Sequence, residues 1–279
     1  MGYSETLLDY DMYLYLHESI NISRFQDERR MFVHTIDLAE GAGGDYSVIN
    51  IFELLPMTLE EIENVTLIED EYSFFKLVQI AMFRSNTIIV PDLAKWYYHF
   101  LVEVCIPDNT KICLENNYDG NYFREVLTKL YGDENELDGD FMFFVFPYNM
   151  KDDQSYAVRI GLRQSEHTKN LGTTMMKTQM RQNQLILTEF ITIEEALSFA
   201  RKKTKDGGFG GYCAMIGNDD CIMSVVNITH IRKLPEFQEL IDEVSKYCPK
   251  EFWDAISKKM KTIASSDSSG DITSIFGAK

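Results

Sequence analysis

The sequence predicts an α+β fold, in which antiparallel hairpins pack with helices and a pair of C-terminal helices and a flexible tail close the chain. Runs with alternating or continuous apolar side chains indicate strands, and runs with helical spacing indicate helices. The two kinds are interspersed along the chain. With 279 residues, 45% of them hydrophobic and 25% charged, the chain is long enough for one large domain or two lobes around a hydrophobic core.

An N-terminal lobe is predicted over residues 1–132. It begins with a helix over residues 4–18, which a serine N-cap and a broad apolar side indicate. Apolar-rich runs at residues 31–38 and 47–54 predict two strands joined by a glycine-rich loop. A Thr-x-x-Glu pair at residues 58–61 is a capping box, so a short acidic helix is expected there.

The rest of this lobe is predicted to contain two helices and a hairpin. Residues 71–84 are apolar on every side, which predicts a helix at the centre of the core. Alternation over residues 96–106, followed by turn residues and a strand at 111–114, predicts a hairpin. Pro91 could instead start a helix in the same region. A helix is predicted over residues 121–131.

A C-terminal lobe is predicted over residues 141–264, after an acidic linker loop at residues 133–140. Two helices, which start at Pro235 and Pro249, are expected to close it. Residues 265–279 are rich in serine and predict a flexible tail. The other elements expected in this lobe are strands at 141–146, 156–162 and 184–191, a capped helix over 192–203, and a hairpin over 212–229 that turns at 217–220.

Charge is unevenly distributed. Between Met31 and Phe75 there is no Lys or Arg, but there are ten acidic residues, in a chain with a formal net charge of −17. Such a surface repels nucleic acid and anionic lipid, and it attracts basic partners or cations. We therefore expect no direct nucleic-acid binding by this acidic body. The acidic face is predicted to consist of Glu60, Glu63, Glu69 and Asp70.

The cysteines and the N-terminus favour a cytoplasmic protein. The five cysteines include no Cys-x-x-Cys pair and leave one odd thiol, which is typical of reduced usage. The N-terminus lacks the basic region and apolar run of a secretory signal. No stretch has the roughly 18 apolar residues that a membrane span needs. A cytoplasmic location without membrane contact is the expectation.

No motif with a defined chemistry is present. The glycine run at residues 207–211 follows a predicted helix and precedes a predicted strand, which is the reverse of a phosphate-binding loop. The five histidines are scattered without the spacing of metal ligands. Carboxylate pairs are so frequent in this acidic chain that they carry no information about acid–base catalysis. The sequence therefore predicts no catalytic residue, no metal and no cofactor.

A polar, basic segment stands out at residues 163–183. It is longer than most loops inside a compact domain, and from Arg159 to Arg181 it has five basic residues against one acidic residue. Two alternatives are open: a mobile arm that orders on a partner, or an ordinary surface helix. The binding residues predicted for this basic arm are Arg159, Arg163, His167, Lys169, Lys177 and Arg181.

The tail ends in a small hydrophobic hook formed by Ile272, Ile275 and Phe276. This spacing after a solvated tether suits insertion into the groove of a partner protein. The alternative is a frayed terminus without function.

These features favour a non-enzymatic interaction or assembly module that binds another protein or self-associates as a homo-oligomer through its acidic face, basic arm and tail hook. The chain is rich in Asn, Ile, Lys and Tyr, and this composition is compatible with a phage genome. One alternative is a hydrolase or transferase that acts on a small or nucleotide-like substrate, with Arg159, Arg163 and His167 near a cleft. A second alternative is an acidic inhibitor that mimics nucleic acid.

Overall fold

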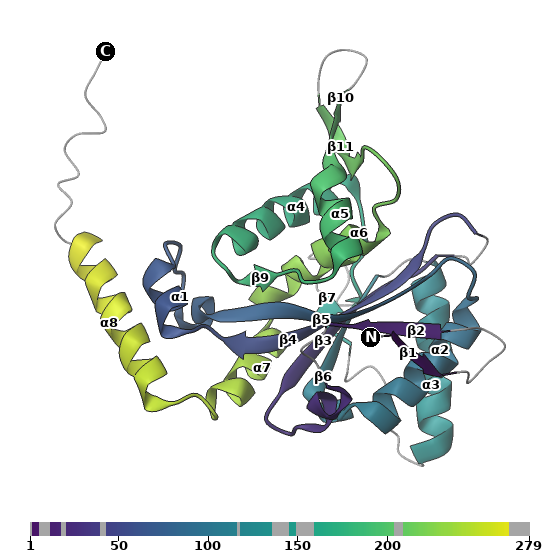
Figure 1. Ribbon diagram of the computed structural model, residues 1–279, viewed down its shortest axis with the longest axis horizontal. Helices are drawn as coiled ribbons and strands as arrows, with labels where there is room; N and C mark the ends of the chain where they lie inside the picture. The colour runs from purple at the N-terminus through teal and green to yellow at the C-terminus, as the bar shows by residue number, and fades with distance from the viewer. Residues whose placement is uncertain are drawn as a thin grey trace.

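The computed structural model describes residues 2–5, 12–17, 21–39, 43–115, 118–135, 145–148, 159–203 and 209–267. A central sheet, seven-stranded within these residues, has the strand order β1-β2-β5-β4-β3-β6, with β9 added beside β5. Helices lie on both of its faces (Figure 1). The predicted α+β class is confirmed.

The middle of the sheet is an antiparallel unit of three consecutive strands, β3, β4 and β5. On the outer side of β3, strand β6 runs parallel to it. Strands β2 and β9 both pair with β5, the first antiparallel and the second parallel. The bounds are β1 Gly2–Glu5, β2 Met12–Leu16, β3 Met31–Asp37, β4 Ser47–Pro56, β5 Phe75–Ser85, β6 Thr110–Leu114 and β9 Leu185–Ile186.

Alternation along β3 sends its side chains into two different cores, because successive strand residues point to opposite faces. Phe32 and Ile36 pack in a core with α2 (Val90–His99), η3 (Phe100–Val104) and α3 (Tyr118–Asn135). Val33 packs on the other face with α6 (Asp220–Ile228) and α7 (Pro235–Ser245). The second face is the one that carries the candidate site.

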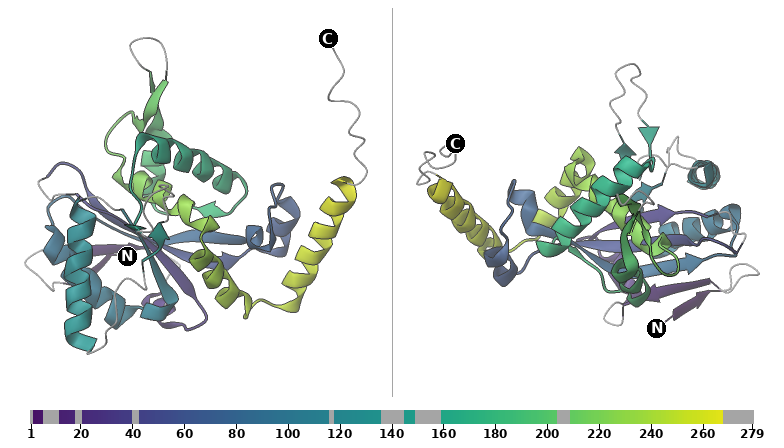
Figure 2. Two further views of the ribbon diagram at one scale, coloured as in Figure 1. Left: turned by 180° about the vertical axis from the view of Figure 1, so that it is seen from behind. Right: turned by 90° about the horizontal axis from the view of Figure 1, so that it is seen from above.

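The remaining elements lie around the central sheet and the helices that cover it (Figure 2). Helix α8 extends at the edge of the molecule beside α1, where Lys259 Nζ donates to the Glu63 carbonyl at 2.7 Å. The bounds are η1 Ile22–Gln26, α1 Leu59–Asn64, η2 Glu71–Phe74, η4 Pro107–Asn109, β7 Pro147–Tyr148, β8 Arg159–Ile160, α4 Glu166–Arg181, α5 Phe190–Ser198, β10 Phe199–Lys203, β11 Phe209–Ala214, η6 Thr229–Lys233 and α8 Lys250–Asp267.

The predicted core helix over residues 71–84 is wrong. The structure has the short turn of η2 followed by strand β5, which pairs with β4 along its whole length. A strand covered on both faces is apolar on both, so its sequence resembles that of a buried helix. The burial of this segment was therefore predicted correctly, but not its secondary structure.

Both predicted hairpins are also wrong. Residues 96–104 belong to α2 and η3, and Pro91 lies in the first turn of α2, in agreement with the alternative interpretation. Residues 220–228 form helix α6, and β11 pairs with β10 instead. The predicted helix over residues 4–18 is replaced by the antiparallel strands β1 and β2 within the described residues.

Several predicted elements are confirmed. Strands β3 and β4 lie where the apolar runs placed them, and α3, α7 and α8 match three predicted helices. Thr58 accepts the Glu61 N–H at 3.3 Å, and Glu61 accepts the Thr58 N–H at 2.8 Å, so the capping box is present. Among the described residues, no helix is long and apolar enough to cross a membrane.

The division into two lobes stays a prediction. Helix α3 extends to Asn135 and so includes the first three residues of the predicted linker, and residues 136–144 lie outside the described part of the chain. The strands predicted at 141–146 and 156–162 lie partly outside it as well. Of these, Val145 forms a parallel bridge with Ile112 and Arg159–Ile160 is β8.

Candidate active site

Two parallel strands bring two carboxyl groups to one edge of the sheet. Asp37 is the last residue of β3, and Glu115 follows the last residue of β6. The Glu115 N–H donates to the Ile36 carbonyl at 3.0 Å, which fixes the two strand ends side by side. The side chains of Asp37 and Glu115 are hydrogen-bonded to each other. Since the carboxyl ends of parallel strands are where open sheets bind ligands, this edge is a plausible site.

Helix α6 adds two more carboxyl groups, Asp219 at its N-cap and Asp220 as its first residue. The helix lies on the face of β3 that Thr35 and Asp37 share, and the Ser224 and Thr35 hydroxyl groups are in contact. The Asn50 side-chain amide donates to the Cys221 carbonyl at 3.1 Å. These contacts hold the N-terminus of α6 above Asp37. Asp37, Glu115, Asp219 and Asp220 are called the carboxylate cluster from here on.

A buried polar network anchors α6 to the sheet below it. Asn50 donates to Ser224 Oγ at 3.2 Å and accepts from Gln79 Nε2 at 2.6 Å. Gln79 in turn contacts the Thr192 hydroxyl at 3.0 Å. These four residues are fully buried. Because a buried polar group without a partner is costly, a network with these connections specifies the position of the helix.

Protein donors orient each carboxylate of the α6 end. Asp220 Oδ2 accepts the Tyr46 N–H at 2.9 Å and Asn218 Nδ2 at 3.2 Å. Asp219 Oδ2 accepts Lys169 Nζ at 3.2 Å and the Ala214 N–H at 3.3 Å. Asp219 makes no side-chain capping bond to α6. Its carboxylate is thus directed away from the helix axis and toward α4.

Glu115 is oriented from the opposite side by two amides in series. Asn227 Nδ2 on α6 donates to Glu115 Oε2 at 3.4 Å. Gln164 Nε2, in the segment before α4, donates to Asn227 Oδ1 at 2.9 Å. The same α6 therefore positions Glu115 through its C-terminal half and supplies Asp219 and Asp220 at its N-terminus.

Among the described residues, most carboxyl groups of the cluster have no recorded cationic partner. Burial raises the pKa of Asp37 well above its usual range, and the adjacent Glu115, with the charges of Asp220 and Asp219, raises that pKa further. Burial, Asp45 and Asp219 also raise the pKa of Asp220, against the hydrogen bonds from Tyr46 and Asn218. Among the described residues, Lys169 is the one cation recorded in an ion pair with the cluster.

Carboxylate oxygens are the ligands that hard divalent cations such as Mg²⁺ and Mn²⁺ prefer, so the chemistry of the cluster fits such an ion. In this structure Glu115 acts on the Asp37 carboxyl through a side-chain hydrogen bond and through its charge, and both raise the Asp37 pKa. Within the described residues, no three acidic, histidine or cysteine side chains stand close enough together to hold an ion as they are placed. Binding would require the Asp37–Glu115 hydrogen bond to open.

The predicted basic arm is a helix, as the second of its two alternatives had it. Most of it is α4, which begins at a capping pair in which the Thr168 N–H donates to Ser165 Oγ at 3.2 Å. Of the predicted binding residues, Lys169 faces the carboxylate cluster and Arg159 lies in β8. The exposed ones are Arg163, His167, Lys177 and Arg181. Their binding role stays a prediction.

The predicted acidic face is exposed at all four of its residues, Glu60, Glu63, Glu69 and Asp70. Lys233 pairs with Glu69 at 3.8 Å. The tail hook, Ile272, Ile275 and Phe276, lies outside the described residues. Both interaction surfaces stay predictions.

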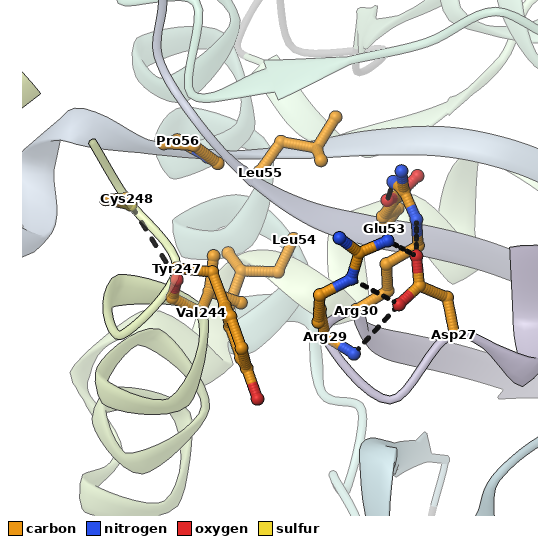
Figure 3. A pocket seen from close by; sticks show the side chains of 10 residues that line it. All are labelled: Asp27, Arg29, Arg30, Glu53, Leu54, Leu55, Pro56, Val244, Tyr247 and Cys248. Atoms are coloured by element: carbon orange, nitrogen blue, oxygen red, sulfur yellow. Dashed lines mark hydrogen bonds and ion pairs between the residues drawn. The ribbon is translucent and has the colours of Figure 1, made fainter.

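A different acidic residue of the same window, Glu53, is buried beside a pocket of about 210 Å³ that the side chains in Figure 3 line. Arg24 Nε bonds to Glu53 at 2.7 Å, and Arg30 Nη1 contacts its other oxygen. Glu53 is therefore a neutralised structural carboxylate, unlike those of the cluster.

Sequence reasoning missed the whole carboxylate cluster. In the sequence, Asp37 falls within the acidic window, and Asp219 and Asp220 fall within the turn predicted at residues 217–220. The available signal was an acidic residue directly after each of two apolar strands, in Ile36-Asp37 and Leu114-Glu115. This pattern indicates a site only if the two strands are parallel neighbours. The predicted hairpin paired residues 111–114 with residues 96–106, so it did not place them beside β3.

No protein-family model matches the chain. Similar solved structures include the large terminase nuclease from thermophilic phage G20c with bound cobalt, which is 15% identical, with a TM-score of 0.45, over 72% of this chain and 81% of that one. The Thermus phage P74-26 large terminase nuclease domain is 14% identical, with a TM-score of 0.41, over 71% of this chain and 77% of that one. Likeness at this level does not transfer an activity.

These findings correct the leading interpretation of the sequence. A non-enzymatic interaction or assembly module was expected, but the similar structures are nucleases and so are enzymes. Carboxylates are frequent throughout this chain, and the sequence alone does not show which of them lie together at one edge of the sheet. The hydrolase alternative agrees better with the comparisons.

Proposed function

We propose that this chain is a divalent-cation-dependent hydrolase that cleaves phosphodiester bonds in nucleic acid. The observation that supports the proposal is the carboxyl pair of Asp37 and Glu115, with the charges of Asp219 and Asp220 nearby at the N-terminus of α6. Like charges placed together in a partly buried site are unfavourable unless a proton or a cation compensates them. Perturbed acidic groups of this kind gather at functional sites.

The roles of the protein residues follow from their contacts. Asp37 and Glu115 would hold the cation, with Asp220 or Asp219 completing its ligands. A bound ion of this kind supplies an activated water and stabilises negative charge on phosphate oxygens. Asn227 orients Glu115, and the Tyr46 N–H orients Asp220. Ligand-orienting residues of this type commonly change metal affinity or activity by about 10- to 100-fold when they are removed.

The charge around the site favours a polyanionic substrate. A cluster of carboxylates repels phosphate until cations neutralise it, so the substrate must also be attracted elsewhere. Helix α4 supplies that attraction, because Lys169 adjoins the cluster and Lys177 and Arg181 are exposed farther along it. The acidic body and the basic helix would then act together on one substrate.

The test is a cleavage assay with the full chain on supercoiled plasmid and on labelled single- and double-stranded oligonucleotides. We expect cleavage with Mg²⁺ or Mn²⁺ and none with EDTA. The variants Asp37→Asn and Glu115→Gln should lose at least about 100-fold in rate, since they remove ligands rather than groups that orient them. The matched control Glu60→Gln changes an exposed residue of the same acidic window and should keep full activity.

Two outcomes would contradict the proposal. One is the absence of cleavage by the wild-type chain with every divalent cation tested. The other is full activity in a folded Asp37→Asn variant, with folding checked by thermal unfolding.

A further inference from the structure

Two cations from different elements meet at one aromatic side chain next to the candidate site. Lys177 Nζ, from α4, lies 3.0 Å from the Tyr212 hydroxyl and 4.4 Å from the centroid of its ring. The Arg201 guanidinium, from β10, lies 5.1 Å from the same centroid. Tyr212 stands on β11 and stacks on Phe199, with ring centroids 5.7 Å apart. Three elements thus build this group.

Within the described residues, these two cations have no recorded carboxylate partner. Both side chains are exposed. Lys177 and Arg201 lower the pKa of the Tyr212 hydroxyl. The ring offers both cations a cation–π contact. Tyr212 therefore holds two like charges together on the surface.

Helix α4 connects the Lys177–Arg201 pair with the carboxylate cluster. Lys169, which bonds to Asp219, and Lys177 lie on the same helix, eight residues apart. This separation is about 12 Å along the helix axis, or roughly three to four nucleotides at about 3.4 Å per nucleotide of one strand. The hairpin of β10 and β11 stands beside α4 in the views of Figures 1 and 2.

We propose that Lys177 and Arg201, held together by Tyr212, bind the phosphate backbone of a nucleic-acid strand whose adjoining nucleotides reach the carboxylate cluster. The inference rests on the proposed function and names the residues that hold its substrate. A guanidinium group binds phosphate through paired hydrogen bonds, and an ammonium group binds it as a point charge. Phosphate contacts carry no sequence information, so this cation pair predicts binding without sequence preference.

The test is fluorescence anisotropy of a labelled 30-nucleotide strand with the full chain in EDTA, so that no cleavage occurs. The double variant Lys177→Gln/Arg201→Gln should weaken binding by at least about tenfold at 0.1 M salt. It should also reduce the slope of log K against log salt by about 1.4, since each lost phosphate contact on a single strand removes about 0.7. Tyr212→Phe keeps the ring but loses the hydroxyl, and should weaken binding by a smaller factor.

The matched control is Lys258→Gln/Lys261→Gln, which removes two exposed cations from α8 and should leave the slope unchanged. Equal losses in the two double variants would overturn the inference, because net charge alone would then explain them. An unchanged affinity in Lys177→Gln/Arg201→Gln would overturn it too, as would tighter binding of polyglutamate than of the oligonucleotide.

The two proposals can fail separately. If the Lys177/Arg201 effect on binding is found but no cation supports cleavage, the proposed function fails and the binding site remains. If cleavage depends on Asp37 but the double variant binds normally, the proposed function remains and this site fails.

Discussion

Glu53 and Asp37 come from the same acidic window and from neighbouring strands, yet their surroundings are opposite. Glu53 is fully buried and bonded to Arg24 and Arg30. Asp37 is bonded to another carboxyl group, with two more aspartates nearby. Glu53 is fully buried and Asp37 is half-buried, but the two differ more in their partners. The difference lies in the counter-charge, which is present at Glu53 and must come from outside at Asp37.

His34 shows a third way to bury an ionisable group. His34 lies on β3, the same strand as Asp37, and is fully buried. Its Nδ1 is hydrogen-bonded to the Tyr97 hydroxyl at 2.8 Å. Its Nε2 has no hydrogen-bond partner among the described residues. Burial lowers the pKa of His34 to about 3. The side chain therefore stays neutral instead of acquiring a counter-ion.

The largest effect should come from breaking the neutralised carboxylate. Glu53→Gln removes the carboxylate that Arg24 and Arg30 share, although Arg30 keeps its ion pair with Asp27. We expect a loss of about 3 kcal/mol in the free energy of unfolding. This is the low end of the usual range, because both arginine side chains are more than a quarter exposed, at 27% and 29%. Urea unfolding measures it. If Glu53→Gln lowered the free energy of unfolding by less than the exposed control Glu60→Gln, Glu53 would not be a stabilising, neutralised carboxylate. It would then not differ from Asp37 in the way described above.

The second effect concerns the cluster itself. A divalent cation that binds only the folded chain should stabilise it by about 2.7 kcal/mol at 100 times its dissociation constant. In Asp37→Asn this cation-dependent rise in stability should disappear, because a ligand is lost, whereas Glu60→Gln should retain it. Thermal unfolding with and without Mn²⁺ measures the difference. Equal stabilisation of Asp37→Asn would place the ion elsewhere.

The third effect is a pH dependence due to His34. Its folded pKa is depressed, so between pH 6.5 and 3 the unfolded chain binds a proton that the folded chain does not. Stability is therefore lost as pH falls, by about 2 kcal/mol between pH 7.5 and 5.0. His34→Leu should reduce this loss relative to wild type. The exposed control His167→Gln should leave it unchanged, and an equal reduction in both would refute the assignment to His34.

The smallest effect should come from the one cation paired with the cluster. Lys169→Gln should change the free energy of unfolding by less than about 1 kcal/mol, since ion pairs with partial solvent access contribute little. It should also raise the affinity for a divalent cation by up to about fivefold, because a competing positive charge is removed. Calorimetric titration with Mn²⁺ measures this affinity. A lower affinity would show that Lys169 helps to build the site.

Local patterns in the sequence were sufficient where one element could be interpreted by itself. The apolar runs of β3 and β4, the capping box at Thr58, and the proline-started helix α7 all lie where their residues predict. They failed for β5, α2 and α6. A strand or helix buried on most sides has no polar face, so its period cannot be recognised.

The sequence by itself determined the α+β class, the confirmed strands and helices, the acidic window and the basic residues of α4. Only the tertiary structure decided that β6 lies parallel to β3 and that α6 is a helix whose N-terminus stands above their ends. The physical reason is that Asp37, Glu115 and Asp220 are far apart in the chain, and their shared electrostatics arise only from non-local strand pairing and helix packing.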